Sequence, residues 1–435
     1  MNNYVEKLYG LFLEQRKIST DSRNISTGDI FFALKGDSFN GNVFALDALK
    51  QGATLSVVDD LALKDKEGCF YVPNVLLALQ QLANYHRKQL QIPVIGITGS
   101  NGKTTTKELL ACVLQTKFRV FATKGNLNNH IGVPLSVLSI TNDVEVAIIE
   151  MGANNIGEIE LLASIAEPSY GIITNIGNAH LKGFGSFEGV KQAKGELYGN
   201  IAAKGGIVFA NTGNPVLAEM IKHHGLLCNT LTYDTGYFNA TAQISGDLPF
   251  LEVSLTVPQT GRAITIHTSL VGAYNLENVL AAVRVGLYFN VDIDKIRSAL
   301  EGYKPSNSRS QLLKTKRNTV IVDAYNANPT SMEAALRNFG KLTCSKKVAI
   351  LGEMLELGDY SDTEHQRILS VAQSLGCDEI ILVGEGFKGH HAPNNIYFNH
   401  VDDCVTYVRE NPIIGAYILV KGSRGVHLEK VVELL

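Results

Sequence analysis

The stretch ITGSNGKTTTKELL, residues 97–110, decides the fold of the middle of the chain, because it joins a strand to a helix through a glycine loop. The standard phosphate-binding loop reads G-x-x-x-x-G-K-[ST]. Five residues before Gly102 the chain has Ile97 instead of glycine, so the loop is the shorter G-x-x-G-K-T of residues 99–104. Strand, glycines, lysine, threonine and helix still occur in order, which predicts a phosphate site facing backbone N–H groups and a helix N-terminus.

Each residue type in this loop suits a bound nucleotide. Gly99 and Gly102 leave room for a phosphate to approach the backbone. Lys103 supplies a cation for the β- and γ-phosphates, and the Thr104 hydroxyl can ligate Mg²⁺. The alternative is a helix N-terminus with an incidental Gly-Lys-Thr. The predicted nucleotide contacts within the loop are Gly99, Ser100, Asn101, Gly102, Lys103, Thr104 and Thr105.

Two further residues are candidates for the magnesium site. Glu150 ends the predicted strand 145–152, and His180 follows the predicted strand 170–177. The carboxyl ends of parallel strands meet at one sheet edge, where ligands bind, and nucleotide-bound Mg²⁺ takes one or two protein ligands. The alternatives are a carboxylate facing water and a structural histidine.

The alternation of apolar strands with helices along the 435 residues predicts an α/β protein with mostly parallel sheets. We expect a small N-terminal α/β domain over 1–88, a central doubly wound P-loop domain over 89–303, and a C-terminal Rossmann-like α/β domain over 304–435. Residues 240–270 alternate and contain turn signals, which predicts a small antiparallel part. A polar stretch near 303 suits a linker. The predicted strands are 29–36, 53–60, 92–99, 145–152, 170–177, 205–211, 319–326, 347–354, 379–386 and 416–423, and the predicted helices include 76–90, 103–117, 186–203 and 275–289.

Composition excludes several classes of function. Lys plus Arg is 39 and Asp plus Glu is 42, so no broad basic field favours nucleic acid or a membrane surface. The six cysteines are scattered without a C-x-x-C pair, which is typical of reduced thiols. No apolar run is long enough to span a membrane, and the N-terminus does not read as a signal peptide. These observations predict a soluble cytoplasmic protein.

Six motifs in this order resemble the Mur ligases, the ATP-dependent amide ligases of peptidoglycan precursor synthesis. They are TGSNGKTTTK, IEMGANNIGEI, TNIGNAHLKGFGSFEGVKQAKGELY, GAYNLENVLAA, DAYNANPTSM and LGEMLELG. The motifs NAHLKGFGS, DAYNANPTSM and LGEMLELG are most similar to the members that add D-alanyl-D-alanine to a UDP-MurNAc-tripeptide. The resemblance implies ATP and Mg²⁺ as cofactors, these two small-molecule substrates, an acyl-phosphate intermediate and a monomer.

The resemblance assigns roles to further residues of the ATP site. Lys194, in QAKGELY, matches a lysine that is carbamylated in several Mur ligases and can then hold a second Mg²⁺; a surface lysine is the alternative. Asn275 and Asn278 match asparagines that read adenine, although Asn275 could instead cap a helix. Arg309 matches an arginine near the γ-phosphate, with a surface arginine as the alternative. Asp323 and Tyr325 match residues beside the ribose and phosphates. The implied catalytic residues are Lys103, His180, Lys194 and Arg309, and the implied metal ligands are Thr104, Glu150, His180 and Lys194.

The resemblance also suggests substrate contacts at both ends of the chain. In TDSRNISTGDIFFALKGDSFNGN, residues 20–42, the residues matched to the UDP moiety are Ser22, Arg23, Lys35 and Gly36, with a structural turn as the alternative. In LVKGSRGVHLEKVV, residues 419–432, the candidates for the dipeptide carboxylate are Lys421, Ser423 and Arg424. Two positions depart from the family pattern: Tyr274 stands where a histidine is usual, and Asn40-Gly41-Asn42 replaces D-G-H.

Two other functions remain open from the sequence. A sister ligase, or a folylpolyglutamate synthase, would add a single amino acid. The diamino-acid ligase typically has D-H-L-D where this chain has N-A-H-L at 178–181, and folylpolyglutamate synthase lacks a UDP-binding N-terminal domain. A nucleotide-binding regulator without turnover would have no chemical need for Lys103, Thr104, Glu150, His180 and Lys194 together.

Overall fold

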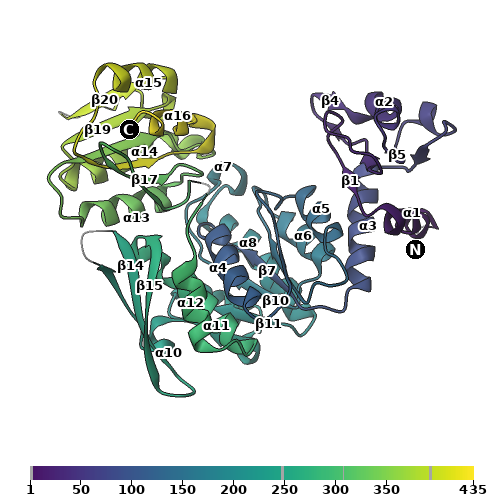
Figure 1. Cartoon of the computed structure of the whole chain (residues 1–435), viewed down its shortest axis with the longest axis horizontal. Coiled ribbons are helices and arrows are strands. Elements are labelled where there is room, and N and C mark those ends of the chain that lie inside the picture. The colour runs from purple at the N-terminus through teal and green to yellow at the C-terminus, as the bar shows by residue number, and fades with distance from the viewer. Residues whose placement is uncertain (1–2, 246–248, 307, 391–393) are drawn as a thin grey trace.

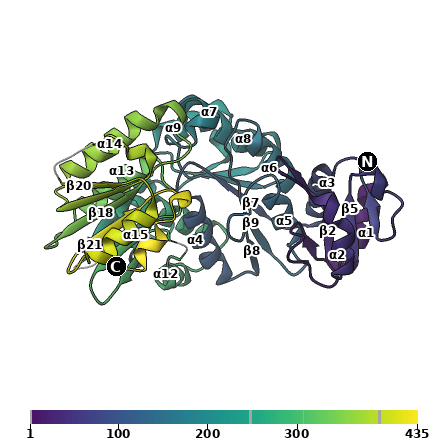
Figure 2. The same ribbon diagram turned by 90° about the horizontal axis from the view of Figure 1, so that it is seen from above.

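The computed structural model describes residues 3–245, 249–306, 308–390 and 394–435. Three α/β domains follow one another along an elongated molecule, with the N-terminal domain at one end and the C-terminal domain at the other (Figures 1 and 2). This arrangement of mostly parallel sheets confirms the predicted fold class. The predicted antiparallel segment and the predicted linker each include residues outside the described ranges, at 246–248 and 307.

The N-terminal domain is built on a short parallel sheet of order β1-β2-β5-β6. The segment predicted as one strand at 29–36 forms two, β2 and β3, and β3 pairs with β4 in a small antiparallel hairpin. Its strands are β1 (Ile18–Ser19), β2 (Ile30–Phe32), β3 (Lys35–Gly36), β4 (Phe39–Asn40), β5 (Leu55–Val58) and β6 (Cys69–Tyr71), and its helices are α1 (Asn3–Gln15) and α2 (Ala45–Lys50). Helix α3 (Val75–Gln89) connects this domain to the next and packs against helices of both.

The central sheet has the order β12-β11-β10-β7-β9-β8, with every neighbouring pair parallel. Helices cover both faces, as expected for strands that are apolar along their whole length. The strands are β7 (Val94–Thr98), β8 (Val120–Ala122), β9 (Val146–Glu150), β10 (Tyr170–Ile173), β11 (Ile207–Ala210) and β12 (Thr230–Thr232). The helices are α4 (Lys103–Gln115), α5 (Gly132–Leu138), α6 (Glu158–Ala166), α7 (Leu181–Phe184), α8 (Phe187–Ala203), α9 (Pro215–His223) and α10 (Thr235–Phe238).

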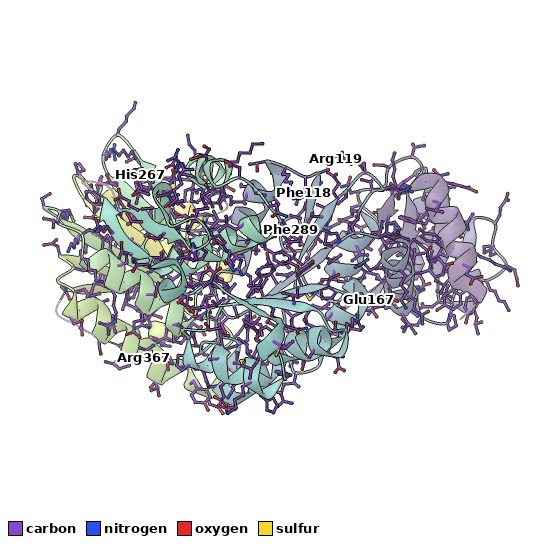
Figure 3. The ribbon with its side chains drawn as sticks, turned by 90° about the horizontal axis from the view of Figure 1, so that it is seen from below. Phe118, Arg119, Glu167, His267, Phe289 and Arg367 are labelled. Atoms are coloured by element: carbon purple, nitrogen blue, oxygen red, sulfur yellow. The ribbon has the colours of Figure 1, made fainter. Side chains whose placement is uncertain are left out.

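An antiparallel sheet and two helices complete the middle domain. Strands β13 (Thr241–Ser245), β14 (Phe250–Val257) and β15 (Arg262–Val271) pair in that order, which confirms the predicted antiparallel part. Helix α11 (Leu276–Tyr288) packs on α4 and is followed by α12 (Ile293–Gly302). Phe118, just after α4, meets Phe289, just after α11, edge to face with ring centroids 6.2 Å apart (Figure 3). This contact joins the ends of the two helices that begin beside the glycine loop.

The C-terminal domain has a sheet of order β16-β17-β21-β18-β19-β20, in which only the pairing of β16 with β17 is antiparallel. Its strands are β16 (Gln311–Lys314), β17 (Thr319–Asp323), β18 (Lys347–Gly352), β19 (Glu379–Val383), β20 (Asn395–Phe398) and β21 (Tyr417–Lys421), and its helices are α13 (Pro329–Gly340), α14 (Ser361–Ser374), α15 (Val401–Glu410) and α16 (Glu429–Val432). The carboxyl ends of β17 and β21 therefore lie side by side, which brings Asp323 next to Lys421.

Candidate active site

A cleft of about 710 Å³ lies between the middle and C-terminal domains, at the carboxyl ends of the central strands. It is lined by the glycine loop, by the ends of β9 and β10, by the start of α11 and by the ends of β17 and β21. Most of the residues that the sequence nominates for ATP and metal meet here: Ser100, Asn101, Gly102, Lys103, Thr104, Thr105, Glu150, His180, Asn275, Asn278, Arg309, Asp323 and Tyr325. Lys421, nominated for the dipeptide, lines the same cleft.

The glycine loop needs both of its glycines for steric reasons. Gly99 has φ +139°, and a Cβ there would lie 2.0 Å from Thr174 Oγ1. Gly102 has φ +79°, and a Cβ there would lie 2.7 Å from Asn278 Oδ1. The loop is also fixed to the segment after β10, because the Asn101 amide donates to Asn175 Oδ1 over 3.0 Å. The loop therefore holds its shape through contacts with the neighbouring strand and with α11.

Lys103, the first residue of α4, folds back over this loop. Its Nζ donates to the carbonyl of Gly99 over 2.6 Å and to that of Ser100 over 3.3 Å. Burial lowers the pKa of Lys103 to about 8, with a smaller lowering from nearby Arg309, while Glu150 opposes the shift. Phosphate oxygens in the cleft would favour the charged form of this amine and draw it to them.

Thr104 and Glu150 form an oxygen pair that fits Mg²⁺. Thr104 Oγ1 lies 3.1 and 3.0 Å from the two carboxylate oxygens of buried Glu150. Asn128 donates to Glu150 Oε1 over 2.9 Å, and Lys107 Nζ lies 3.6 Å from Glu150 Oε2. No group of three or more His, Cys, Asp or Glu residues converges within the described ranges. Mg²⁺ does not require such a group, because it takes one or two carboxylates and completes its shell with phosphate and water.

His180 adopts a left-handed backbone conformation, φ +53°, immediately before α7. Its Nδ1 contacts the carboxylate of Glu356, a residue of the C-terminal domain. This contact with His180 lowers the pKa of Glu356, although partial burial opposes the shift. His180 thus lies in the cleft with one ring nitrogen already engaged by the opposite domain.

Lys194 lies behind the cleft on α8 and is almost completely buried. Its Nζ donates to the Ala153 carbonyl over 3.3 Å and lies 5.0 Å from the centroid of the Phe184 ring. Burial, together with the nearby charge of Lys103, lowers the pKa of Lys194 to about 7, while Glu158 and Glu196 oppose the shift. Lys194 is therefore a buried amine and not the surface lysine that was the alternative.

The two asparagines that are predicted to contact adenine form a buried chain of hydrogen bonds. Asn278 Nδ2 donates to Asn275 Oδ1 over 2.9 Å, and Asn275 Nδ2 donates to the Val271 carbonyl over 2.9 Å. Thr106 of α4 donates to Asn278 Oδ1 over 3.0 Å. Asn275 stands at the start of α11, but its side chain caps no N–H there. The alternative that the Asn275 side chain caps the helix is therefore wrong.

The C-terminal side of the cleft contains a stacked arginine and a buried ion pair. The Arg309 guanidinium lies 3.7 Å from the centroid of the Tyr325 ring. Lys421 Nζ lies 2.6 Å from Asp323 Oδ2, so the two side chains form an ion pair. Arg424 lies 5.4 Å from the same tyrosine ring.

The remaining nominated residues lie outside the cleft. Ser423 is buried, and its hydroxyl accepts from the Leu355 amide over 3.0 Å. In the N-terminal domain, Ser22 precedes the exposed Arg23, which pairs with Asp21, and Lys35 pairs with Asp59 over 2.8 Å. Lys35 and Gly36 form the short exposed strand β3.

The unusual Asn40-Gly41-Asn42 segment has a structural role in the N-terminal domain. Asn42 donates to Asp59 Oδ1 over 2.8 Å, and its own side-chain oxygen accepts from the Asp59 amide over 3.0 Å. Asn42 thus holds the carboxylate that pairs with Lys35, and an amide serves this purpose as both donor and acceptor.

Sequence reasoning missed several residues that complete the site. Asn328 exchanges side-chain hydrogen bonds with Asn101 across the domain gap, at 2.7 and 3.5 Å. Glu356 meets His180, and Asn128 and Lys107 hold Glu150. The one available signal was Asn-Pro at 328–329, which predicts a turn and indeed caps α13. It carries no information on the loop that lies 227 residues away in the chain.

Comparison with known protein families places this fold and cleft in one class. The model of the Mur ligase family, catalytic domain, matches residues 15–95; that of the Mur ligase middle domain matches 97–286; that of the Mur ligase, glutamate ligase domain, matches 308–424. The chain belongs to the Mur ligase family.

Individual relatives narrow the class. The chain is 35% identical to the UDP-N-acetylmuramoyl-tripeptide–D-alanyl-D-alanine ligase of Bacillus subtilis, over 96% of this chain and 92% of the relative. It superposes on a crystal structure of MurF from Acinetobacter baumannii with TM-score 0.86 and 31% identity, covering 96% of this chain and 93% of that one. It also resembles the MurF ligase from Thermotoga maritima in complex with ADP, with TM-score 0.86 and 26% identity, covering 97% of each chain.

Proposed function

We propose that the chain is an ATP-dependent amide ligase that joins D-alanyl-D-alanine to a UDP-N-acetylmuramoyl-tripeptide in peptidoglycan precursor synthesis. The observation that carries this proposal is the likeness to ligases of that name over nearly the whole chain, 35% identity across 96% of its length. The cleft supports it, because the loop, cations and oxygen ligands that such a reaction needs converge there.

The chemistry requires an activated carboxylate. The terminal carboxylate of the tripeptide attacks the γ-phosphorus of ATP, ADP leaves, and an acyl phosphate results. The dipeptide amine then attacks the carbonyl carbon, and the tetrahedral intermediate collapses to an amide and phosphate. Lys103 and Arg309 provide fixed positive charge where anions must meet, which stabilises developing charge in a site shielded from water. A Mg²⁺ ion held by Thr104 and Glu150 would supply Lewis-acid neutralisation of the phosphates.

We propose that Lys194, once carbamylated, is a ligand of a second Mg²⁺ ion in the cleft. A pKa of about 7 means that a substantial fraction of its amine is neutral at neutral pH. A neutral amine is the form that reacts with carbon dioxide, and the resulting carbamate is an anion that can bind a cation. His180, on the same side of the cleft, offers its unengaged ring nitrogen for the same purpose. Asn275 and Asn278 are proposed to contact the adenine, Asp323 and Tyr325 the ribose and phosphates.

We assign the two ends of the chain to the substrates, with domains at 1–88, 89–303 and 304–435. Ser22, Arg23, Lys35 and Gly36 would contact the UDP moiety. Ser423 and Arg424 would contact the dipeptide, with Lys421 joining them when its pair with Asp323 opens. We also propose that the protein is a monomer of the cytoplasm, where ATP and UDP-linked precursors are available. Among the described residues, every helix is too short or too polar to cross a membrane, and the cysteines are free.

The test is phosphate release by the purified protein with ATP, Mg²⁺ and UDP-MurNAc-tripeptide, with and without D-alanyl-D-alanine. We expect release that depends on the dipeptide, and a product whose mass equals tripeptide plus dipeptide less water. Release that follows a single amino acid would move the chain to a sister ligase. ATP binding without turnover for any substrate pair would identify a regulator.

A further inference from the structure

The C-terminal domain reaches the metal side of the cleft through the loop at residues 353–358, which follows β18. Glu356 of this loop contacts the middle domain with both its side chain and its backbone. Its carboxylate contacts His180 Nδ1, and its backbone carbonyl accepts from the Lys182 amide over 3.0 Å. Side chain and backbone together thus bind the segment that begins α7.

The geometry on both sides of this contact is strained. His180 has φ +53° and Glu356 has φ +68°, which is uncommon for residues that carry a side chain. Such conformations cost free energy and persist only where surrounding contacts determine them. Here the surrounding contacts are visible: the Met354 amide donates to His365 Nε2 over 2.9 Å, and the Leu355 amide donates to Ser423 Oγ over 3.0 Å.

Glu356 contacts the Nδ1 atom of His180, and this choice of ring nitrogen sets the tautomer of the imidazole. A carboxylate in contact with Nδ1 favours the tautomer that carries its proton on Nδ1, which leaves the ring lone pair on Nε2. Histidines that bind metal ions commonly donate their other ring N–H to a carboxylate, which fixes both the tautomer and the ring orientation. His180 lines the same cleft as Thr104 and Glu150. With Nδ1 in contact with Glu356, Nε2 is the ring nitrogen left for a cation held in that cleft.

We propose that Glu356 is the positioning residue of His180, supplied across the domain gap, so that the metal side of the cleft is complete only when the C-terminal domain is docked. The inference deepens the proposed function and rests on it. Because coupling between two sites is reciprocal, a metal ion held by His180 favours docking of the loop 353–358 to the same extent that docking favours the metal ion.

The experiment measures metal binding without turnover. Mn²⁺ is titrated into the protein in the presence of a non-hydrolysable ATP analogue, and free Mn²⁺ is read by electron paramagnetic resonance. Glu356→Gln keeps the side-chain size and removes the charge, and the side chain is 48% exposed, so the fold tolerates the change. We expect Mn²⁺ affinity to fall about 10-fold, in the range typical for loss of a partner of a metal-binding histidine. The matched control is Asp359→Asn, three residues along the same segment, which should stay within about 2-fold of wild type because it lies outside the contact.

A double-mutant cycle separates positioning from a general structural effect. In a His180→Asn background, Glu356→Gln should have no further effect on Mn²⁺ affinity, because its action passes through the imidazole. An equal loss in both backgrounds, or wild-type affinity in Glu356→Gln, overturns the inference.

Hydrogen exchange tests the reciprocal effect. Mn²⁺ with the nucleotide should slow amide exchange in residues 353–358 of the wild type, and should not do so in His180→Asn. Unchanged exchange in the wild type would also overturn the inference. Failure of the wild-type protein to bind Mn²⁺ and nucleotide at all would instead contradict the proposed function, and the two failures are therefore distinguishable.

Discussion

Replacing Gly99 by alanine should disrupt the glycine loop by an amount that the structure allows us to work out. At φ +139° a residue with a side chain is strained, which costs about 1–3 kcal/mol. The new Cβ would lie 2.0 Å from Thr174 Oγ1, so that hydroxyl must move. Its hydrogen bond of 2.6 Å to the Asn101 carbonyl is then lost, at about 1 kcal/mol. The two effects add to about 2–4 kcal/mol.

This cost can appear in two measurable quantities. If the loop keeps its shape, the free energy of unfolding falls; if the loop rearranges, ATP affinity falls. Chemical denaturation and calorimetric titration of an ATP analogue together should therefore show a summed loss of about 2–4 kcal/mol, where about 1.4 kcal/mol is tenfold in affinity. We expect most of the loss in affinity, because the hydroxyl that must move holds Asn101, a loop residue that lines the cleft.

Gly205→Ala is the matched control for this substitution. Gly205 has φ +63°, but a Cβ there meets no atom within 4 Å, and the residue precedes β11 at the sheet edge opposite the cleft. It should cost about 1 kcal/mol in unfolding free energy and leave ATP affinity unchanged. If Gly99→Ala matched this control in both measurements, the steric reasoning about the loop would be refuted.

Three further substitutions test separate parts of the site. Thr104→Val removes the hydroxyl beside Glu150. It should weaken Mg²⁺-dependent binding of an ATP analogue about 10-fold in calorimetry, because one hydrogen bond to a charged group is lost. An affinity equal to that of the wild type would contradict this. The pKa of Lys194 is lowered to about 7 in the folded state, so between about pH 7 and the ordinary lysine value the unfolded chain binds one proton more than the folded chain. In carbonate-free buffer, the unfolding free energy of wild type relative to Lys194→Met should therefore rise by about 1.4 kcal/mol per pH unit over that range. A difference that does not change with pH would be inconsistent with a buried amine. Asn328→Ala removes the cap of α13 and the hydrogen bonds between Asn328 and Asn101. It should lower the unfolding free energy by about 1–2 kcal/mol and raise the KM for ATP. An unchanged KM would show that the contact with Asn101 does not support the loop.

Local chemistry explains why much of this fold and site could be predicted. The loop at 97–104 was readable because strand, glycines, lysine and threonine are neighbours in sequence, and Glu150 and His180 follow from the rule that parallel strands end at one edge. The short edge strands β8, β12, β16 and β20 were missed, since strands of three or four residues leave little periodicity to read.

Contacts between domains could not be predicted from the sequence. Asn101 meets Asn328, and His180 meets Glu356, only because the C-terminal domain docks in one orientation, which no local pattern encodes. Within the C-terminal domain, the pairing of β17 with β21 is also not encoded by a local pattern, and it places Lys421, which we assigned to the dipeptide, against Asp323. Helix periodicity predicted that 76–90 is a helix, but not that its side chains, such as Asn84, reach Glu167 of the middle domain.

The most direct test of the central claim follows the oxygen atoms. UDP-MurNAc-tripeptide labelled with ¹⁸O in both oxygens of its terminal carboxylate is incubated with ATP, Mg²⁺ and D-alanyl-D-alanine, and phosphate and product are analysed by mass spectrometry. Activation through an acyl phosphate predicts one label in the released phosphate and one in the new amide carbonyl. Phosphate that carries no label would mean that water cleaves ATP in this cleft, and would contradict the account.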